Sequence, residues 1–99
     1  MTREIGLKCI ASAGQFADEV AIKGADFSGE AFSFFANRKF VELDGDVEIG
    51  GEVPALLAVV PLAKEGDLVL IQLPGQTFGN GCTITVKEVD LEQRSASLL

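Results

Sequence analysis

The fold is decided by residues 67–87, which read DLVLIQL, then PGQTFGNG, then CTITVK. Two apolar runs rich in β-branched residues flank a break made of proline, glycine and asparagine. This pattern predicts a β-hairpin, because side chains alternate between the faces of a strand while Gly and Asn tolerate the positive φ of a tight turn. Since Pro74 cannot donate to a strand ladder, we expect it to end the first strand and to open an eight-residue loop over 74–81.

The inward positions of this hairpin follow from the alternation. One face of each run carries only aliphatic side chains, and we expect that face to lie at the centre of the hydrophobic core. The residues on it are Val69, Ile71, Ile84 and Val86.

Shorter strand signals fill the rest of the chain. Turn residues recur about every 8–12 positions between short alternating runs, and no convincing amphipathic helix is found among them. Together with the hairpin, these runs predict a mainly β fold, a small antiparallel β-barrel or sandwich with little or no helix. The additional strands are expected over 4–11, 19–23, 31–36, 40–43, 47–49 and 55–60.

The turn residues 44–46 predict a second hairpin. A three-residue loop there would pair Leu43 with Val47 and Val41 with Ile49. That register puts the apolar side chains on one face of the hairpin, whereas a slip of one residue would turn them over.

The segment 53–63 fits two structures. Pro54 could begin a helix at its first position, but Pro61 would end that helix within two turns. A short buried strand over 55–60, bracketed by the two prolines, fits the pattern better. The sequence leaves both alternatives open.

The chain contains a faint internal echo between residues 18–43 and residues 67–91. Each segment opens with Asp and a strand, passes through a Gly-containing break with a Phe, and enters a second strand. Two SH3-like halves would produce this layout, and so would a chance likeness between two hairpins. In both cases the 99 residues predict one domain. We expect it to span 1–93, with a last helical turn over 89–93 and a C-terminal tail over 94–99.

The formal net charge of −7 limits the partners. An acidic surface repels phosphate, so we expect neither nucleic acid nor a membrane surface as a partner. The chain has no apolar run long enough to cross a membrane and no signal peptide at its start, which favours a cytoplasmic protein. The apolar fraction of 47% favours self-association as a homodimer, and the acidity also suits a basic protein partner.

The residue types restrict the chemistry. The chain has no histidine, tyrosine or tryptophan, so it lacks the usual neutral-pH base and the commonest transition-metal ligand. We therefore expect a protein that is not an enzyme and that holds no cofactor and no metal. Cys9 and Cys82 form no CxxC pair and are expected to be two buried thiols in a reducing cytoplasm, a single disulfide being the alternative.

Two kinds of side chain are candidates for contacting a partner. Carboxylates are densest over 42–48, but the run departs from a calcium-binding loop at Ile49 and Ala55, so we interpret it as a solvated hairpin tip. Phe78 lies in the glycine-rich loop and Phe35 faces away from its strand neighbours, and an exposed Phe can anchor a partner. The predicted partner-binding residues are Phe35, Phe78, Glu42, Asp44, Asp46 and Glu48.

Three hypotheses for function remain. The first is a non-enzymatic binding or interaction protein that is homo-oligomeric. The second is an acidic inhibitor or decoy protein from a mobile element, which would block a basic groove on another protein. The third is a small-ligand-binding β-barrel with its pocket at the mouth of the barrel.

Overall fold

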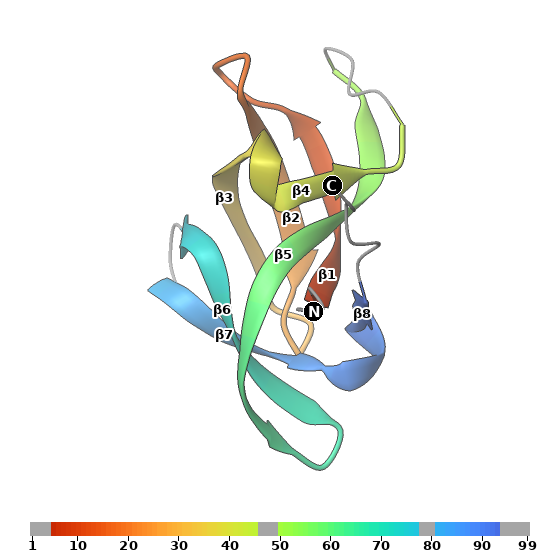
Figure 1. The fold of residues 1–99 in the computed structure, drawn as a ribbon, viewed down its shortest axis with the longest axis vertical. Coiled ribbons are helices and arrows are strands. Elements are labelled where there is room, and N and C mark those ends of the chain that lie inside the picture. Colours follow the sequence, from red (N-terminus) through yellow and green to blue (C-terminus); the bar gives the residue numbers. More distant parts are fainter. Residues whose placement is uncertain (1–4, 46–49, 78–80, 94–99) are drawn as a thin grey trace, which may run out of the picture.

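The computed structural model describes residues 5–45, 50–77 and 81–93. Within these ranges the regular elements are strands and two 3-10 helical turns, and no α-helix occurs there (Figure 1). The strands are β1 (Ile5–Ala13), β2 (Glu19–Ala25), β3 (Ala31–Asn37), β4 (Val41–Leu43), β5 (Glu52–Glu65), β6 (Leu68–Thr77), β7 (Gly81–Lys87) and β8 (Leu91–Gln93), and the turns are η1 (Arg38–Phe40) and η2 (Glu88–Asp90).

These strands form one antiparallel sheet with the order β3-β2-β1-β5-β6-β7. Two short strands extend it, because β4 pairs with β5 and β8 pairs with β1. The sheet curls into a half-barrel, and β5 runs along most of the length of the molecule (Figure 1). The predicted mainly β, antiparallel fold is confirmed.

The same succession of elements occurs twice. The succession β3, η1 and β4 recurs fifty residues later as β7, η2 and β8. Each element of the second set has the same length as its counterpart in the first. The backbone N–H of Arg38 donates to the carbonyl of Asp18 at 2.8 Å, and that of Glu88 donates to the carbonyl of Asp67 at 2.8 Å. The echo between 18–43 and 67–91 therefore corresponds to two halves with one architecture.

The two halves exchange their last strands. β4 closes the first half but pairs with β5 of the second, and β8 closes the second half but pairs with β1 of the first. Since β1 and β5 are neighbours, an approximate two-fold axis passes between the directly paired Leu7 and Leu57. Val41 lies beyond Leu57 in this row, and Leu91 lies beyond Leu7. Each half thus completes the other.

The core lies on the inner face of the curled sheet. On β3, Phe32 and Phe34 point inward with ring centroids 6.4 Å apart, while Phe35 faces outward with 40% of its surface exposed. The hairpin residues expected at the centre are all buried, which confirms that prediction. These residues are Val69, Ile71, Ile84 and Val86.

The segment 53–63 is a strand and not a helix. It belongs to β5, which is longer than the expected strand and contains both prolines. Up to Val59 the strand pairs with β1, and from Val60 onward it pairs with β6. Pro61 lies at a bulge in the β6 ladder, where a missing N–H interrupts no regular bonding. The proline marks the bend between the two partners.

The predicted eight-residue loop over 74–81 is wrong. β6 continues past Pro74 to Thr77, which pairs directly with Gly81. The ladder between β6 and β7 is irregular between Gln72 and Thr77, so the N–H that Pro74 lacks has no regular partner to lose.

Two other expectations are revised. Val41 and Leu43 lie opposite Leu57 and Ala55 of β5, and the expected strand over 47–49 lies outside the described residues. The predicted helical turn over 89–93 begins one residue earlier as η2 and then becomes β8, because this strand finds a partner in β1. The predicted tail over 94–99 also lies outside the described residues.

The hairpins β2–β3 and β6–β7 contact each other directly. The backbone N–H of Phe27, in the turn between β2 and β3, donates to the carbonyl of Thr85 on β7 at 2.9 Å. On the other hairpin, Gly75 lies against the ring of Phe34, and a Cβ at Gly75 would lie 3.1 Å from Cδ2 of that ring. A residue without a side chain permits this close approach of β6 to β3.

The turn that presents Phe27 is held by Asp26. Its Oδ1 accepts hydrogen bonds from the Ser28 N–H at 2.9 Å, the Ser28 hydroxyl at 2.7 Å and the Glu30 N–H at 3.0 Å. These bonds favour the carboxylate, so they lower the pKa of Asp26, the Ser28 hydroxyl most of all. The connection over residues 26–30 is therefore a side-chain-capped turn.

Candidate binding surface

Two rows of side chains cross the outer face of the sheet, the side opposite the core. In the first row, Glu42 of β4 lies opposite Leu56 of β5, and Leu56 lies opposite Lys8 of β1. Neighbouring strands are about 4.8 Å apart, so this row spans about 10 Å. It runs from a carboxylate over an aliphatic side chain to a lysine.

The second row repeats this order one step further along the strands. The backbone N–H of Asp44 donates to the carbonyl of Pro54 at 2.9 Å, which places Asp44 beside β5. Pro54 lies opposite Ile10, and Ile10 lies opposite Lys23 of β2. All four side chains are exposed. The second row therefore also leads from a carboxylate over apolar residues to a lysine.

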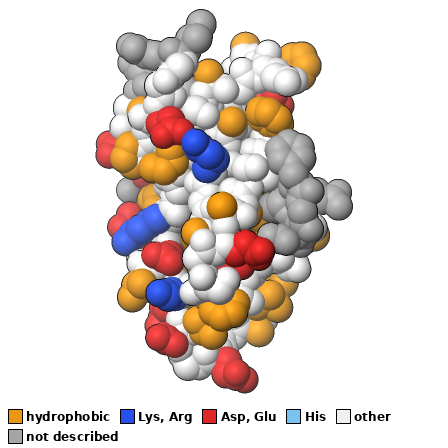
Figure 2. All heavy atoms as spheres, turned by 180° about the vertical axis from the view of Figure 1, so that it is seen from behind, with side chains coloured by type: hydrophobic (Ala, Val, Ile, Leu, Met, Phe, Trp, Pro, Cys, Tyr) orange, Lys and Arg blue, Asp and Glu red, His pale blue; other side chains and the backbone are white. Residues whose placement is uncertain are grey.

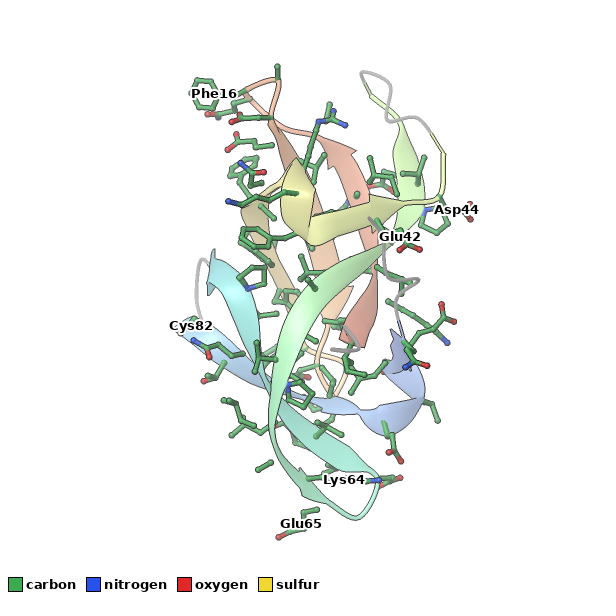
Figure 3. The ribbon with its side chains drawn as sticks, viewed as in Figure 1. Phe16, Glu42, Asp44, Lys64, Glu65 and Cys82 are labelled. Carbon is green, nitrogen blue, oxygen red and sulfur yellow. The ribbon has the colours of Figure 1, made fainter. Side chains whose placement is uncertain are left out.

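Together the rows form an open groove of about 700 Å³. Its floor is apolar, and Glu92 of β8 borders it at one end. Figure 3 shows the carboxylates of Glu42 and Asp44 near each other at the β4 side, pointing away from the ribbon. We call this feature the outer groove, and its floor consists of Ile10, Pro54 and Leu56.

The two lysines of the outer groove make only exposed contacts. The Lys8 ammonium donates to the carbonyl of Val89 at 3.3 Å. The Lys23 ammonium lies 2.5 Å from Oε2 of Glu52, and at least half of each of these two side chains is exposed. An exposed ion pair of this kind contributes about 1 kcal/mol or less, so Lys23 can exchange its partner at little cost.

The structure brings together two of the predicted partner-binding residues. Glu42 and Asp44 both border the outer groove. Phe35 is exposed on β3 and lies opposite Ala21, so it shares the outer face but not the groove. The other three predicted residues lie outside the described residues. These are Phe78, Asp46 and Glu48.

Sequence reasoning missed the basic side of the groove. Lys8 and Lys23 are fifteen positions apart in the chain, and neither belongs to a charged cluster. The alternation over β1 does put Lys8 and Ile10 on the outward face, which was a usable signal. The pairing of β1 with β5, which brings them beside Leu56 and Pro54, is a long-range contact that local patterns do not reveal.

A second exposed apolar area covers the β5–β6 hairpin. Val60, Leu62 and Leu70 are 55%, 49% and 37% exposed, respectively. Leu70 lies opposite Ala63 on one side and Thr85 on the other, so its direct cross-strand neighbours carry no charge. Figure 2 shows hydrophobic side chains gathered at this end of the molecule.

The two cysteines are free and differ in environment. Cys9 is buried and its thiol donates to the carbonyl of Ala55 at 3.6 Å, whereas Cys82 is exposed. The expectation of two buried thiols is therefore wrong for Cys82. Burial raises the pKa of the Cys9 thiol to about 12, so Cys9 is not a thiolate nucleophile at neutral pH.

This difference predicts how the thiols react. Between about pH 7 and pH 9, a thiol reagent should modify Cys82 promptly and Cys9 only as fast as the chain unfolds, because Cys9 is both buried and un-ionised there. Mass spectrometry of the labelled chain over time measures both rates. Denaturant should make the two rates similar. Prompt labelling of Cys9 in the native protein would contradict its placement in the core.

The described carboxylates and thiols do not assemble into a metal site. Within residues 5–45, 50–77 and 81–93, no three Cys, Asp or Glu side chains are grouped so that they could hold an ion. Of the carboxylates of the outer groove, Glu42 lies on β4, Asp44 follows the end of that strand, and Glu92 lies on β8.

Comparison of the chain with protein-family models, with curated proteins and with solved structures finds no match. Among the described residues, no helix has the length and apolar character needed to cross a membrane.

Proposed function

We propose that this protein is a non-enzymatic interaction module that works as a homodimer. The observation that carries the proposal is the outer groove, an open depression with an apolar floor on the face of the central strands. Open apolar surface of this kind is stabilised when a partner removes it from water. A face made of rigid, paired strands also loses little conformational freedom when it binds.

The chemistry of the groove supports binding over catalysis. Its borders are carboxylates and lysines on neighbouring strands, and the thiol of Cys9, which belongs to the core, is held un-ionised by burial. Salt-dependent contacts between charged rims and an apolar centre are typical of protein–protein interfaces. The net charge of −7 argues against nucleic acid as the partner.

We also propose a cytoplasmic location. The exposed free thiol of Cys82 supports it, because exposed thiols persist in reducing compartments and are oxidised elsewhere.

The first test is the mass of the protein in solution. Sedimentation equilibrium and light scattering over a wide concentration range should give a mass that rises from 10.4 kDa to twice that value. The substitution Ile10→Lys, in the floor of the groove, should weaken the dimer about tenfold or more. Ile10 is 38% exposed, so a partner would bury only this remaining part of the side chain, which contributes about 1 kcal/mol or less, and the cost of burying the lysine charge adds to that loss.

A matched control separates this effect from a general loss of apolar surface. Phe16 is 67% exposed and lies in the loop between β1 and β2, away from the groove residues. Phe16→Lys should leave the dimer unchanged, with both variants as stable as the parent by circular dichroism. A parent chain that stays at 10.4 kDa at high concentration would refute the homodimer.

A further inference from the structure

We infer that the partner in the outer groove is a second copy of this chain, related by a two-fold axis that runs parallel to β1 and β5. The inference rests on the proposed homodimer and specifies its interface. It follows from the order of charges across the sheet. Each row starts with a carboxylate at the β4 side and ends with a lysine at the β1 or β2 side.

A face with this order is complementary to itself in one orientation. A two-fold axis along the strands turns the second copy so that its lysine side lies over the carboxylate side of the first. Asp44 then faces Lys23 of the second copy, and Glu42 lies near Lys8 of the second copy. An axis perpendicular to the strands would not bring these opposite charges together. Complementary charges thus select one arrangement.

The apolar floor fits the same orientation. The axis along the strands passes between β5 and β1, so Pro54 of one copy lies over Ile10 of the other. Two sheets that pack face to face in proteins keep their strands within about 30° of each other, as this axis requires. The apolar contact lies at the centre of the interface and the charges lie at its rim, where they set the register.

The charge of the whole chain makes the arrangement of these residues important. Two copies each carrying −7 repel one another at long range, and salt screens this repulsion beyond about 10 Å. Local ion pairs at contact distance must therefore favour association. On the β1 and β2 side of the groove, Lys8 and Lys23 outnumber the one carboxylate there, that of Glu92, and the exposed Lys23–Glu52 pair can exchange its partner.

Charge reversal tests the arrangement. One variant carries Glu42→Lys and Asp44→Lys, and the other carries Lys8→Glu and Lys23→Glu. Each alone should associate at least tenfold more weakly than the parent chain, because like charges then face each other across the axis. An equimolar mixture of the two variants should form a heterodimer with about the parent affinity, since opposite charges face again at both rims.

Matched controls carry the same changes in net charge outside the groove. Asp18→Lys with Glu30→Lys matches the first variant, and Lys39→Glu with Lys64→Glu matches the second; all four side chains are exposed. These controls should shift the dimer affinity less than threefold. Circular dichroism melting checks that every variant is folded.

The outcomes are distinct. A monomeric parent chain refutes the homodimer and this interface together. A parent dimer that tolerates both groove variants, or a mixture that stays monomeric, overturns the interface and leaves the homodimer standing. Dissociation by Leu70→Lys, with no effect of the groove variants, would place the contact on the β5–β6 hairpin and would also overturn the inference.

Discussion

Replacing Leu57 with alanine should lower the free energy of unfolding by about 2–5 kcal/mol. The side chain is fully buried and lies at the approximate two-fold axis between Leu7 and Val41. Its removal leaves a cavity beside Leu7 of β1 and Val41 of β4, and the pairing of these strands with β5 limits how far the backbone can collapse into it. A chain of 99 residues has a stability of about 5–15 kcal/mol, so the loss is a large fraction.

Urea unfolding followed by far-ultraviolet circular dichroism measures this loss, since the chain has no tryptophan or tyrosine to report by fluorescence. Leu62→Ala is the matched control, because Leu62 lies on the same strand but is 49% exposed. Leu62→Ala should lower the free energy of unfolding by well under half as much as Leu57→Ala. Leu7→Ala should lower the free energy of unfolding by about as much as Leu57→Ala, because Leu7 is the equivalent of Leu57 across the two-fold axis. Equal losses for Leu57 and Leu62 would contradict the assignment of the core.

The strands were predictable because they depend on local patterns. Alternation of apolar residues marks β1, β2, β3 and β7 to within about two residues of their bounds. It also identifies the buried face of the hairpin from Val69 to Val86. Prolines misled the prediction at β5 and β6, because Pro61 and Pro74 lie where the ladders are irregular and cost no hydrogen bond. A proline ends a strand only where its N–H is needed.

The pairing of the strands was not predictable from such patterns. β4 is three residues long, and nothing near it in the sequence indicates that its partner lies in β5. The outer groove depends on this pairing, because Asp44 and Lys23 lie in one row only through the strands β5 and β1 between them. The sequence therefore predicted the acidic side of the site, which is a local run, and missed the basic side, which the sheet assembles.

The exchange of β4 and β8 leads to the prediction with the largest effect. A chain divided between residues 48 and 49 should give two halves that are each unfolded alone. The first half would lose β5 as the partner of β1 and β4, and the second would lose β1 as the partner of β5 and β8. The row from Val41 to Leu91 would be cut at its centre. About fifty residues without these contacts bury too little apolar surface to offset the entropy of folding.

Mixing the halves should restore the fold, because every lost contact joins one half to the other. Circular dichroism and a nitrogen–proton correlation spectrum of each half, alone and mixed, measure this. The matched control is a circular permutant with the same break, closed by a short glycine–serine linker beyond Gln93, which lies directly opposite Ile5. The linker keeps both halves in one molecule, so the permutant should fold at any concentration.

A half that folds alone would show that its own hairpin suffices and that strand exchange adds only stability. If instead the mixed halves and the permutant both stay unfolded, the continuity of the chain between β4 and β5 is itself required, and the two-fold relation does not extend to folding.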